Sequence, residues 1–448
     1  MSYVNGGSLN TQNDERYIYA DNAATTPLSP RALEAMTPHL EGSFGNPSGI
    51  HRIAREAAKA LSDARSTMAR FLGAASPDEV YFTSGGSEAD NWILRGAVGR
   101  HRDLYGQQAP ARIITSSIEH HAVLHCCEAL EREGVLVTYL PVDEHGLISP
   151  ADLEAALTAN EAAEREADAH IDRQGALGVN APSSRTVPPA TALVSIMMAN
   201  NEVGTIEPIR ELAAIAHAHG VPFHTDAVQA MGHIPVDVCD LGVDALSLSA
   251  HKFHGPRGIG ALYLRDGLSI PPFIAGGGQE RGVRAGTENL AGIVGMAAAL
   301  EEACEHLAST MGHIESLRND LAHHILDTVD AVELTGAPID GPGRNGASPA
   351  CGTTRLPSIA SFICHNVDGE LLVVLLDRAG VAAATGSACS TGSTEPSHVL
   401  TAMGVPASTA RGALRLSLAS DATAADIALL CQRVPACIKR ARLISGMR

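Results

Sequence analysis

Lys252 is the residue whose surroundings first suggest chemistry in this sequence. It follows a segment of alternating apolar and hydroxyl residues typical of a buried strand, and a turn rich in Gly and Pro comes next. The end of a buried strand is an unusual place for a solvated charge. Two interpretations are open: a surface lysine on a loop, or a lysine that forms a Schiff base with an aldehyde cofactor.

The second interpretation requires further groups, and the chain offers them. A pyridoxal phosphate site needs a carboxylate for the pyridine nitrogen and donors for the phosphate. Asp226 ends an apolar strand about one βα unit before Lys252, and the turn 84–87 lies between a strand and a helix. Open α/β sheets bind ligands at the carboxyl ends of their strands. Taken singly, however, a strand-end Asp is usually a helix cap, and most glycine-containing turns bind nothing.

Two more side chains could complete such a site. Gln229 lies one turn after Asp226 and could donate to the phenolic oxygen of the cofactor. His120 ends the segment 115–120 and could stack on the cofactor ring. A histidine in this position has an ordinary structural explanation as well, so the constellation depends on the fold that positions it.

Alternating strands and helices predict that fold. Apolar segments at 80–83, 112–115, 136–140, 192–198 and 222–226 alternate with helical patterns. This order predicts an α/β fold with a mostly parallel sheet and helices on both faces.

After 276–278 the composition shifts, and the pattern becomes α+β, with one long helical run from about 289 to 329. We therefore predict a large domain over 21–270, with an exposed insertion at 161–189. We expect 1–20 and 271–448 to form a small domain with a mobile loop at 384–395.

Composition limits the function classes. With 448 residues, 45% hydrophobic and 18% charged, the chain is globular and long enough for more than one domain. A net charge of -18 disfavours nucleic-acid binding, which needs a basic face. No apolar run has the length of a membrane span or the form of a signal peptide, so we expect a cytoplasmic protein. The nine scattered cysteines include no C-x-x-C pair, which disfavours a zinc site or a disulfide framework.

Ordered motifs over nearly the whole chain resemble one family. The sequence is similar to the cysteine desulfurases of the NifS/IscS type, within the class V, fold-type I pyridoxal-phosphate enzymes. The motifs that carry the resemblance are found at 21–27, 45–48, 83–88, 119–123, 200–204, 226–229, 249–256, 276–280, 284–287, 386–390 and 415–418. One such motif is a weak signal, whereas the ordered set is highly specific.

The resemblance implies a fold and a set of roles. The fold is the fold-type I transferase fold, with a mostly parallel seven-stranded sheet and a smaller α+β domain. Lys252 binds the cofactor and moves the α-proton, while His120 stacks on the ring and is a candidate proton carrier. Arg415 binds the substrate carboxylate, and Asn46 lies in the substrate pocket. The other implied cofactor contacts are Asp226 at the pyridine nitrogen, Gln229 and Asn201 near the ring oxygen, Gly86, Ser87, Ser249 and His251 at the phosphate, and Thr287, which reaches the phosphate of the neighbouring subunit in a homodimer with shared sites.

Cys389 distinguishes this family from its aminotransferase-like relatives. It lies among small residues in 385–393, where no apolar neighbours would bury it as an ordinary structural cysteine. A thiolate is the nucleophile needed to attack the sulfur of L-cysteine, giving alanine and a persulfide on Cys389. The sequence after Cys389 resembles the group with longer loops, which passes sulfur to scaffold or relay proteins, as in iron–sulfur cluster assembly.

Two departures and two alternatives stay open. Ala419 stands where the family commonly has Gly, and the insertion at 161–189 is longer than usual. The chain could instead be a selenocysteine lyase or another class V enzyme acting on a β-substituted amino acid, or a non-catalytic scaffold. The intact set of Lys252, Asp226, His120 and Cys389 argues against the scaffold. The sequence does not identify the sulfur acceptor.

Overall fold

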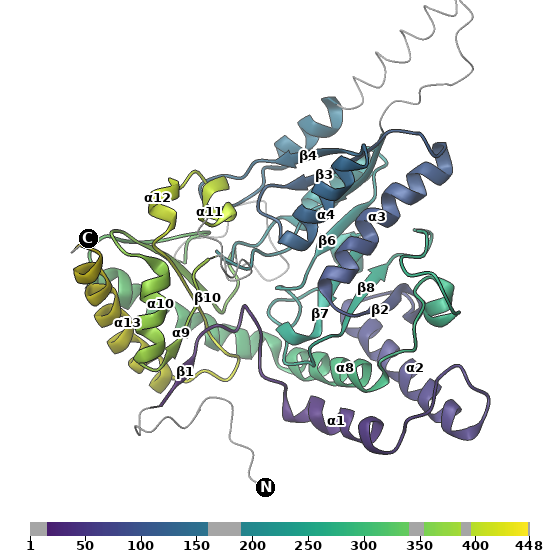
Figure 1. The fold of residues 1–448 in the computed structure, drawn as a ribbon, viewed down its shortest axis with the longest axis horizontal. Coiled ribbons are helices and arrows are strands. Elements are labelled where there is room, and N and C mark those ends of the chain that lie inside the picture. The colour runs from purple at the N-terminus through teal and green to yellow at the C-terminus, as the bar shows by residue number, and fades with distance from the viewer. Residues whose placement is uncertain (1–15, 160–189, 340–353, 387–395, 447–448) are drawn as a thin grey trace, which may run out of the picture.

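A seven-stranded sheet forms the centre of the chain (Figure 1). The computed structural model describes residues 16–159, 190–339, 354–386 and 396–446. The strand order is β2-β8-β7-β6-β5-β3-β4. The strands are β2 (Val80–Thr83), β3 (Ala111–Ser116), β4 (Leu136–Leu140), β5 (Ala190–Ser195), β6 (Phe223–Asp226), β7 (Ala245–Ser249) and β8 (Gly260–Leu264).

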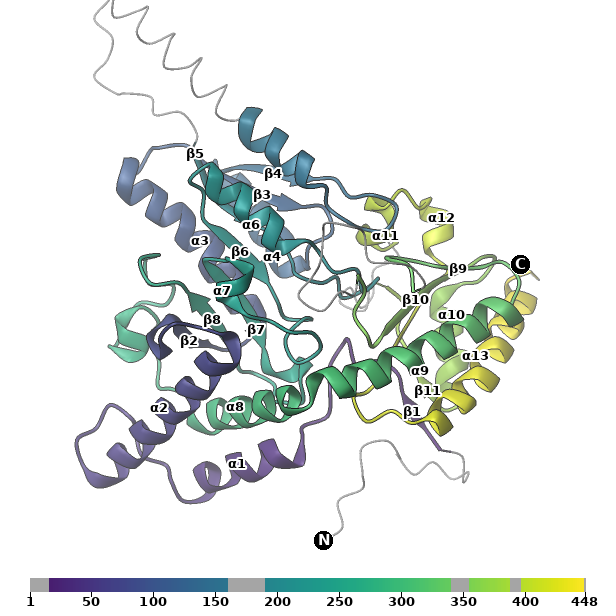
Figure 2. The same ribbon diagram turned by 180° about the vertical axis from the view of Figure 1, so that it is seen from behind.

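The pairing within this sheet is mostly parallel, as predicted. Strands β3 to β7 pair in parallel, and only β8 runs antiparallel to its two neighbours, β7 and β2. All residues of β6, β7 and β8 are buried, which requires cover on both faces. Helices α3 (Gly86–Tyr105) and α4 (His121–Arg132) cover the face seen in Figure 1, and α6 (Ile209–Ala218) and α7 (Val238–Leu241) lie on the face seen in Figure 2.

A second, smaller core surrounds an antiparallel sheet with the order β12-β10-β9. Its strands are β9 (Val332–Leu334), β10 (Ile359–Cys364) and β12 (Ala413–Ser417), and its helices are α9 (Leu307–Thr328), α10 (Gly369–Arg378) and α13 (Ala424–Ser445). Short helices α11 (His398–Ala402) and α12 (Ala407–Ala410) lie beside it. The predicted α+β architecture of the C-terminal part is therefore confirmed.

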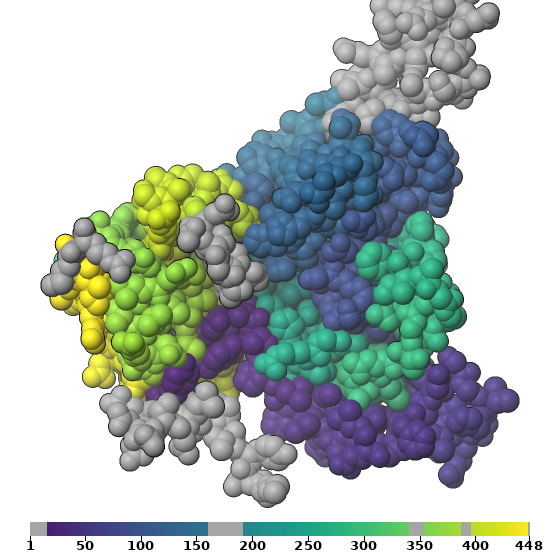
Figure 3. All heavy atoms as spheres, in the orientation of Figure 1, coloured from purple at the N-terminus to yellow at the C-terminus, as the bar shows by residue number. Residues whose placement is uncertain are grey.

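The N-terminal strand joins this second core. β1 (Ile18–Tyr19) pairs in parallel with β11 (Val381–Ala382), and Ile18 is buried in the second core. From there the chain crosses to α1 (Pro30–Glu41) and α2 (Arg52–Leu72). These two helices lie near the β2 edge of the large sheet, away from the second core (Figure 2). In the space-filling view, N-terminal residues in purple fill the surface between the green and teal parts of the molecule (Figure 3).

The prediction of one long helix over 289–329 is wrong. The chain forms α8 (Leu290–Glu305) and then α9, because His306 leaves helical geometry with φ -129 and ψ 26. Helix α8 packs against α1 and α2 in the first core, whereas α9 packs against α13 in the second. By packing, α8 thus belongs with the large sheet, although the expected boundary at residue 270 placed it in the small domain. The expected insertion at 161–189 lies outside the described residues.

No helix in the described ranges has both the length and the apolar character needed to cross a membrane.

A buried ion pair joins α2 to the segment before α8. Both guanidinium Nη atoms of Arg65 donate to the carboxylate of Glu280 at 2.8 Å. The backbone N–H of Phe82 in β2 donates to the same carboxylate at 3.0 Å. Since the two side chains are only 10% and 3% exposed, each charge depends on the other for compensation.

We predict that Glu280→Ala lowers the free energy of unfolding by about 3–5 kcal/mol, because the Arg65 charge would stay buried without its partner. Urea denaturation followed by far-UV circular dichroism measures the change. Asp63→Ala is the matched control, since it breaks the exposed pair with Lys59 and should cost no more than about 1 kcal/mol. Equal losses in the two variants would contradict the prediction.

Candidate active site

A cavity of about 550 Å³ opens at the carboxyl ends of β6 and β7. It lies where ligands bind in open α/β sheets. Among the predicted site residues, ten line this cavity: Gly86, Ser87, His120, Asn201, Asp226, Gln229, Ser249, His251, Lys252 and Arg415. The fold thus brings together residues that are separated by more than three hundred positions in the sequence.

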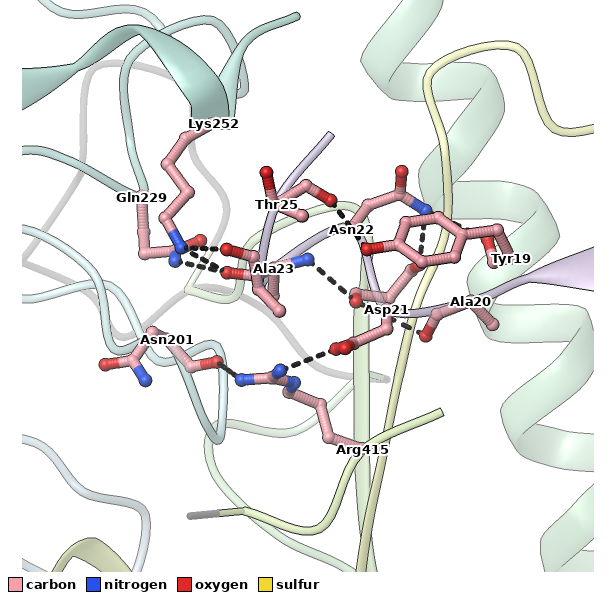
Figure 4. A network of polar contacts seen from close by, with 12 residues as sticks. Tyr19, Ala20, Asp21, Asn22, Ala23, Thr25, Asn201, Gln229, Lys252 and Arg415 are labelled. Atoms are coloured by element: carbon pink, nitrogen blue, oxygen red, sulfur yellow. Dashed lines mark hydrogen bonds and ion pairs between the residues drawn. The ribbon is translucent and has the colours of Figure 1, made fainter. Parts of the chain in front are cut away.

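Lys252 lies in a short 3₁₀ turn directly after β7. Its Nζ donates to the backbone carbonyls of Ala23 and Ala24, at 2.6 and 2.8 Å (Figure 4). The amide of Gln229 donates to the same Ala23 carbonyl at 2.9 Å. The N-terminal segment therefore supplies the acceptors for both side chains.

Two buried carboxyl groups form the base of the cavity. Asp226 ends β6 and accepts a hydrogen bond from the N–H of Val228 at 2.9 Å. Burial raises the pKa of Asp226 to about 6, and the Lys252 charge opposes that shift. Asp90 lines the same cavity, and burial, followed by the Asp226 charge, raises its pKa well above the usual range. Sequence reasoning missed Asp90, whose place on α3 gives no separate signal.

Two histidines of the cavity are neutral. Burial, followed by the Lys252 charge, lowers the pKa of His120 and of His251 to about 4. Nδ1 of His120 accepts the N–H of Ala122 at 3.1 Å, so the neutral ring carries its proton on Nε2. His251 pairs with the hydroxyl of Thr25 through Nδ1 at 3.1 Å. A neutral imidazole with one N–H is suited to stack on a ring and to exchange a proton.

The N-terminus of α3 forms a turn that is suited to bind an anion. The first N–H groups of a helix have no partner within the helix and attract negative charge. Gly86 is the first helical residue, and a Cβ there would lie 2.7 Å from Cγ2 of Val228. Glycine is therefore required for the close approach of this turn to the Asp226 loop.

Arg415 is buried on β12 and links three parts of the chain. One Nη donates to Asp21 at 2.8 Å, and the other donates to the Asn201 carbonyl at 2.8 Å (Figure 4). Its Nε is buried and has no hydrogen-bond partner among the described residues. An unpartnered guanidinium N–H in a cavity is suited to a carboxylate ligand. Asp21 belonged to a recognised motif, but its pairing with Arg415 was not foreseen.

Two predicted residues, Asn46 and Thr287, do not line this cavity. Asn46 is exposed between α1 and α2, where its side chain accepts the Ser48 N–H at 2.9 Å. Thr287 is exposed just before α8. Cys389 lies outside the described residues. Their roles stay predictions.

Comparisons with known proteins agree with this geometry. The family model of the class-V aminotransferases matches residues 18–163 and 167–430. Cysteine desulfurase IscS of Methanosarcina thermophila is 42% identical over 447 residues, covering 100% of this chain and 98% of that protein. A cysteine desulfurase of Cereibacter sphaeroides is 42% identical over 429 residues, covering 96% and 97%.

Solved structures give the same result. A NifS-like protein superposes with a TM-score of 0.77 at 34% identity, over 95% of this chain and 100% of that one. The structure described as SspA in complex with cysteine superposes with a TM-score of 0.68 at 34% identity, over 89% and 98%.

The fold and the site define a class-V aminotransferase-type enzyme, a class that uses pyridoxal phosphate. The donor set fits that cofactor, because a lysine, a buried strand-end carboxylate and a helix N-terminus without room for a side chain line one cavity. Within this class the chain belongs to the cysteine desulfurases of the NifS/IscS type.

We predict that Gly86→Ala weakens binding of pyridoxal phosphate to the apoprotein by at least about tenfold, because the new methyl group displaces Val228 and the anion-binding turn. Titration of apoprotein with the cofactor, followed by visible absorbance, measures the affinity. Gly312→Ala is the control, since this helical glycine has nothing within 4 Å of an added Cβ. Unchanged affinity in Gly86→Ala would refute the assigned turn.

Proposed function

We propose that this protein removes sulfur from L-cysteine, leaving L-alanine and a persulfide on Cys389, with pyridoxal phosphate bound at Lys252. The observation that carries the proposal is the shared cavity of Lys252, Asp226 and Arg415 in a member of the cysteine desulfurases. A carboxylate-binding cation beside the lysine suits an amino-acid substrate. The family relationship favours this activity over a selenocysteine lyase or another enzyme for β-substituted amino acids.

Each residue has a defined task in this proposal. Arg415 binds the substrate carboxylate through Nε and an Nη, and Lys252 Nζ takes the proton from the substrate Cα. Bound pyridoxal phosphate supplies an electron sink for the charge that develops at Cα. Asp226 keeps a proton on the pyridine nitrogen, and His120 exchanges a proton through Nε2.

Sulfur transfer then requires the thiolate of Cys389. It attacks the sulfur of the substrate, forming the S–S bond while the Cβ–S bond breaks. The electron pair of the broken bond stays with Cβ, which takes up a proton. One cysteine and one thiol thus give one alanine and one persulfide, without an external oxidant.

The finer assignments are part of the same proposal. Thr287 contacts the cofactor phosphate of a second subunit in a homodimer, which agrees with its exposure and with its absence from the lining of the cavity in its own chain. A sulfur-acceptor protein takes the persulfide onward, for iron–sulfur clusters or other sulfur-containing products. Asn46 completes the substrate pocket, and the location is the cytoplasm.

We expect Cys389→Ser to abolish alanine formation from L-cysteine, because a serine hydroxyl cannot accept the sulfur. Amino-acid analysis for alanine and mass spectrometry of the persulfide measure the reaction. The visible absorbance of the bound cofactor should remain, since Lys252 is intact. Alanine formation at the wild-type rate in Cys389→Ser would sink the proposed role of this cysteine.

Arg415→Lys should raise KM for L-cysteine by at least about tenfold, because an ammonium cannot make the paired contacts of a guanidinium. Steady-state kinetics of alanine formation give KM and kcat separately. Arg411→Lys, at an exposed arginine before the same strand, should leave both constants unchanged. A KM for Arg415→Lys equal to that of the wild type would contradict the assignment.

A further inference from the structure

Glu202 is a buried acid beside the cavity to which the mechanism gives no task. It is 3% exposed and lies in the turn between β5 and α6. Neighbouring Asn201 lines the cavity, and its carbonyl accepts the Arg415 guanidinium at 2.8 Å. The turn that carries Glu202 is therefore attached to the substrate-binding arginine.

The Glu202 carboxylate lies against two residues that flank one segment of the chain. The hydroxyl of Ser397 donates to Oε2 at 2.5 Å. Gly386 lies against the same oxygen, since a Cβ at Gly386 would be 2.6 Å from Oε2. Gly386 and Ser397 flank the segment 387–395, which contains Cys389. One carboxylate oxygen thus accepts a hydrogen bond at one end of that segment and packs closely against the other.

Both ends have second attachments to the active site. Ala384 forms two backbone hydrogen bonds with Arg415, at 2.7 and 3.2 Å. His398, next to Ser397, pairs through Nε2 with the Glu119 carbonyl at 3.0 Å, one residue before His120. The end at Gly386 is tied to the substrate-binding arginine, and the end at Ser397 is tied to the loop of the ring-stacking histidine.

The turn itself is rigid enough to act as a support. The side-chain oxygen of Asn200 accepts the N–H groups of Glu202 and Val203 at 2.8 and 3.0 Å. The Asn200 amide donates to the Ile118 carbonyl at 3.0 Å. Glu202 therefore has a fixed backbone from which its carboxylate reaches the two ends.

We propose that Glu202 is a positioning residue for sulfur transfer: it fixes the two ends of the segment that bears Cys389 relative to Arg415. This inference rests on the proposed function, in which the Cys389 thiolate must reach a substrate bound at Arg415. The rate of sulfur transfer depends on how the Cys389 thiolate is placed relative to the substrate sulfur, and even a small displacement of a reacting group lowers a rate strongly. A purely structural acid would only stabilise the turn.

The electrostatics agree with this role. Burial raises the pKa of Glu202 to about 7, while the Ser397 hydrogen bond and the Arg415 charge oppose that shift. The side chain therefore carries partial negative charge near neutral pH, and a hydrogen bond from Ser397 to the charged form is stronger than to the neutral form.

The experiment compares Glu202→Ala, Glu202→Gln and Ser397→Ala with wild-type holoenzyme. Glu202→Ala should lower kcat for alanine formation by about tenfold, with KM changed less than about twofold, because substrate binding at Arg415 is retained. Glu202→Gln keeps an acceptor for Ser397 and should lose only about threefold in kcat. Ser397→Ala should fall between the two.

A second readout reports on Cys389 without catalysis. Iodoacetamide alkylation of Cys389, followed by mass spectrometry of its peptide, should change by at least about threefold in Glu202→Ala as the ends are released. The visible absorbance of the cofactor should not change. Glu207→Gln is the matched control, since this buried glutamate binds the Ile148 N–H and does not touch the ends.

Two outcomes would overturn the proposal. One is a kcat and an alkylation rate in Glu202→Ala within twofold of wild type. The other is an equal loss in Glu207→Gln, which would assign Glu202 a merely structural role. If wild-type holoenzyme makes no alanine from L-cysteine, the proposed function fails, while the alkylation rates still decide the role of Glu202.

Discussion

Two cations, the buried Arg415 and the half-buried Lys252, impose the main constraint on this structure. They come from different sheets, and each needs oxygen acceptors because a charge removed from water without compensation is costly. Residues 21–24 supply them: the carbonyls of Ala23 and Ala24 accept from Lys252, and Asp21 pairs with Arg415. The N-terminal segment therefore has to lie between the two cores. Its attachment through β1 and β11, and through Ser417, follows from this requirement.

Burial also determines the protonation states around the cavity. The acids Asp90 and Asp226 have raised pKa values, and the imidazoles of His120 and His251 have lowered ones. The neutral forms of His120 and His251 are thus favoured, and the cationic groups that line the cavity include Lys252 and Arg415. Such opposed shifts within one cavity are typical of catalytic sites rather than of ordinary cores. The same low polarity strengthens every contact that a charged ligand would make there.

Much of the site could be predicted because its residues end neighbouring strands. Asp226 and Lys252 follow β6 and β7, which pair in parallel with Asp226 opposite Ser247, so a strand pattern alone places them together. Asp21 and Glu202 could not be assigned in this way, because their partners lie 394 and 195 residues away in the sequence. The break at His306 was also missed, since apolar residues continue on both sides and only packing against two cores separates α8 from α9. Asn46 and Thr287 do not line the cavity of their own chain, and their predicted roles depend on a second subunit or on the resemblance alone.

The contact between Asp21 and Arg415 has a consequence for biosynthesis. The two residues are 394 positions apart, and at about 5–20 residues per second a ribosome needs roughly 20 to 80 seconds to make the intervening chain. The seven-stranded sheet, with Asp226 and Lys252, emerges well before β12 does. Translation therefore completes the half that carries Asp226 and Lys252 first. The half that carries Arg415 is completed only when β12 leaves the ribosome and pairs with Asp21 near the start of the chain.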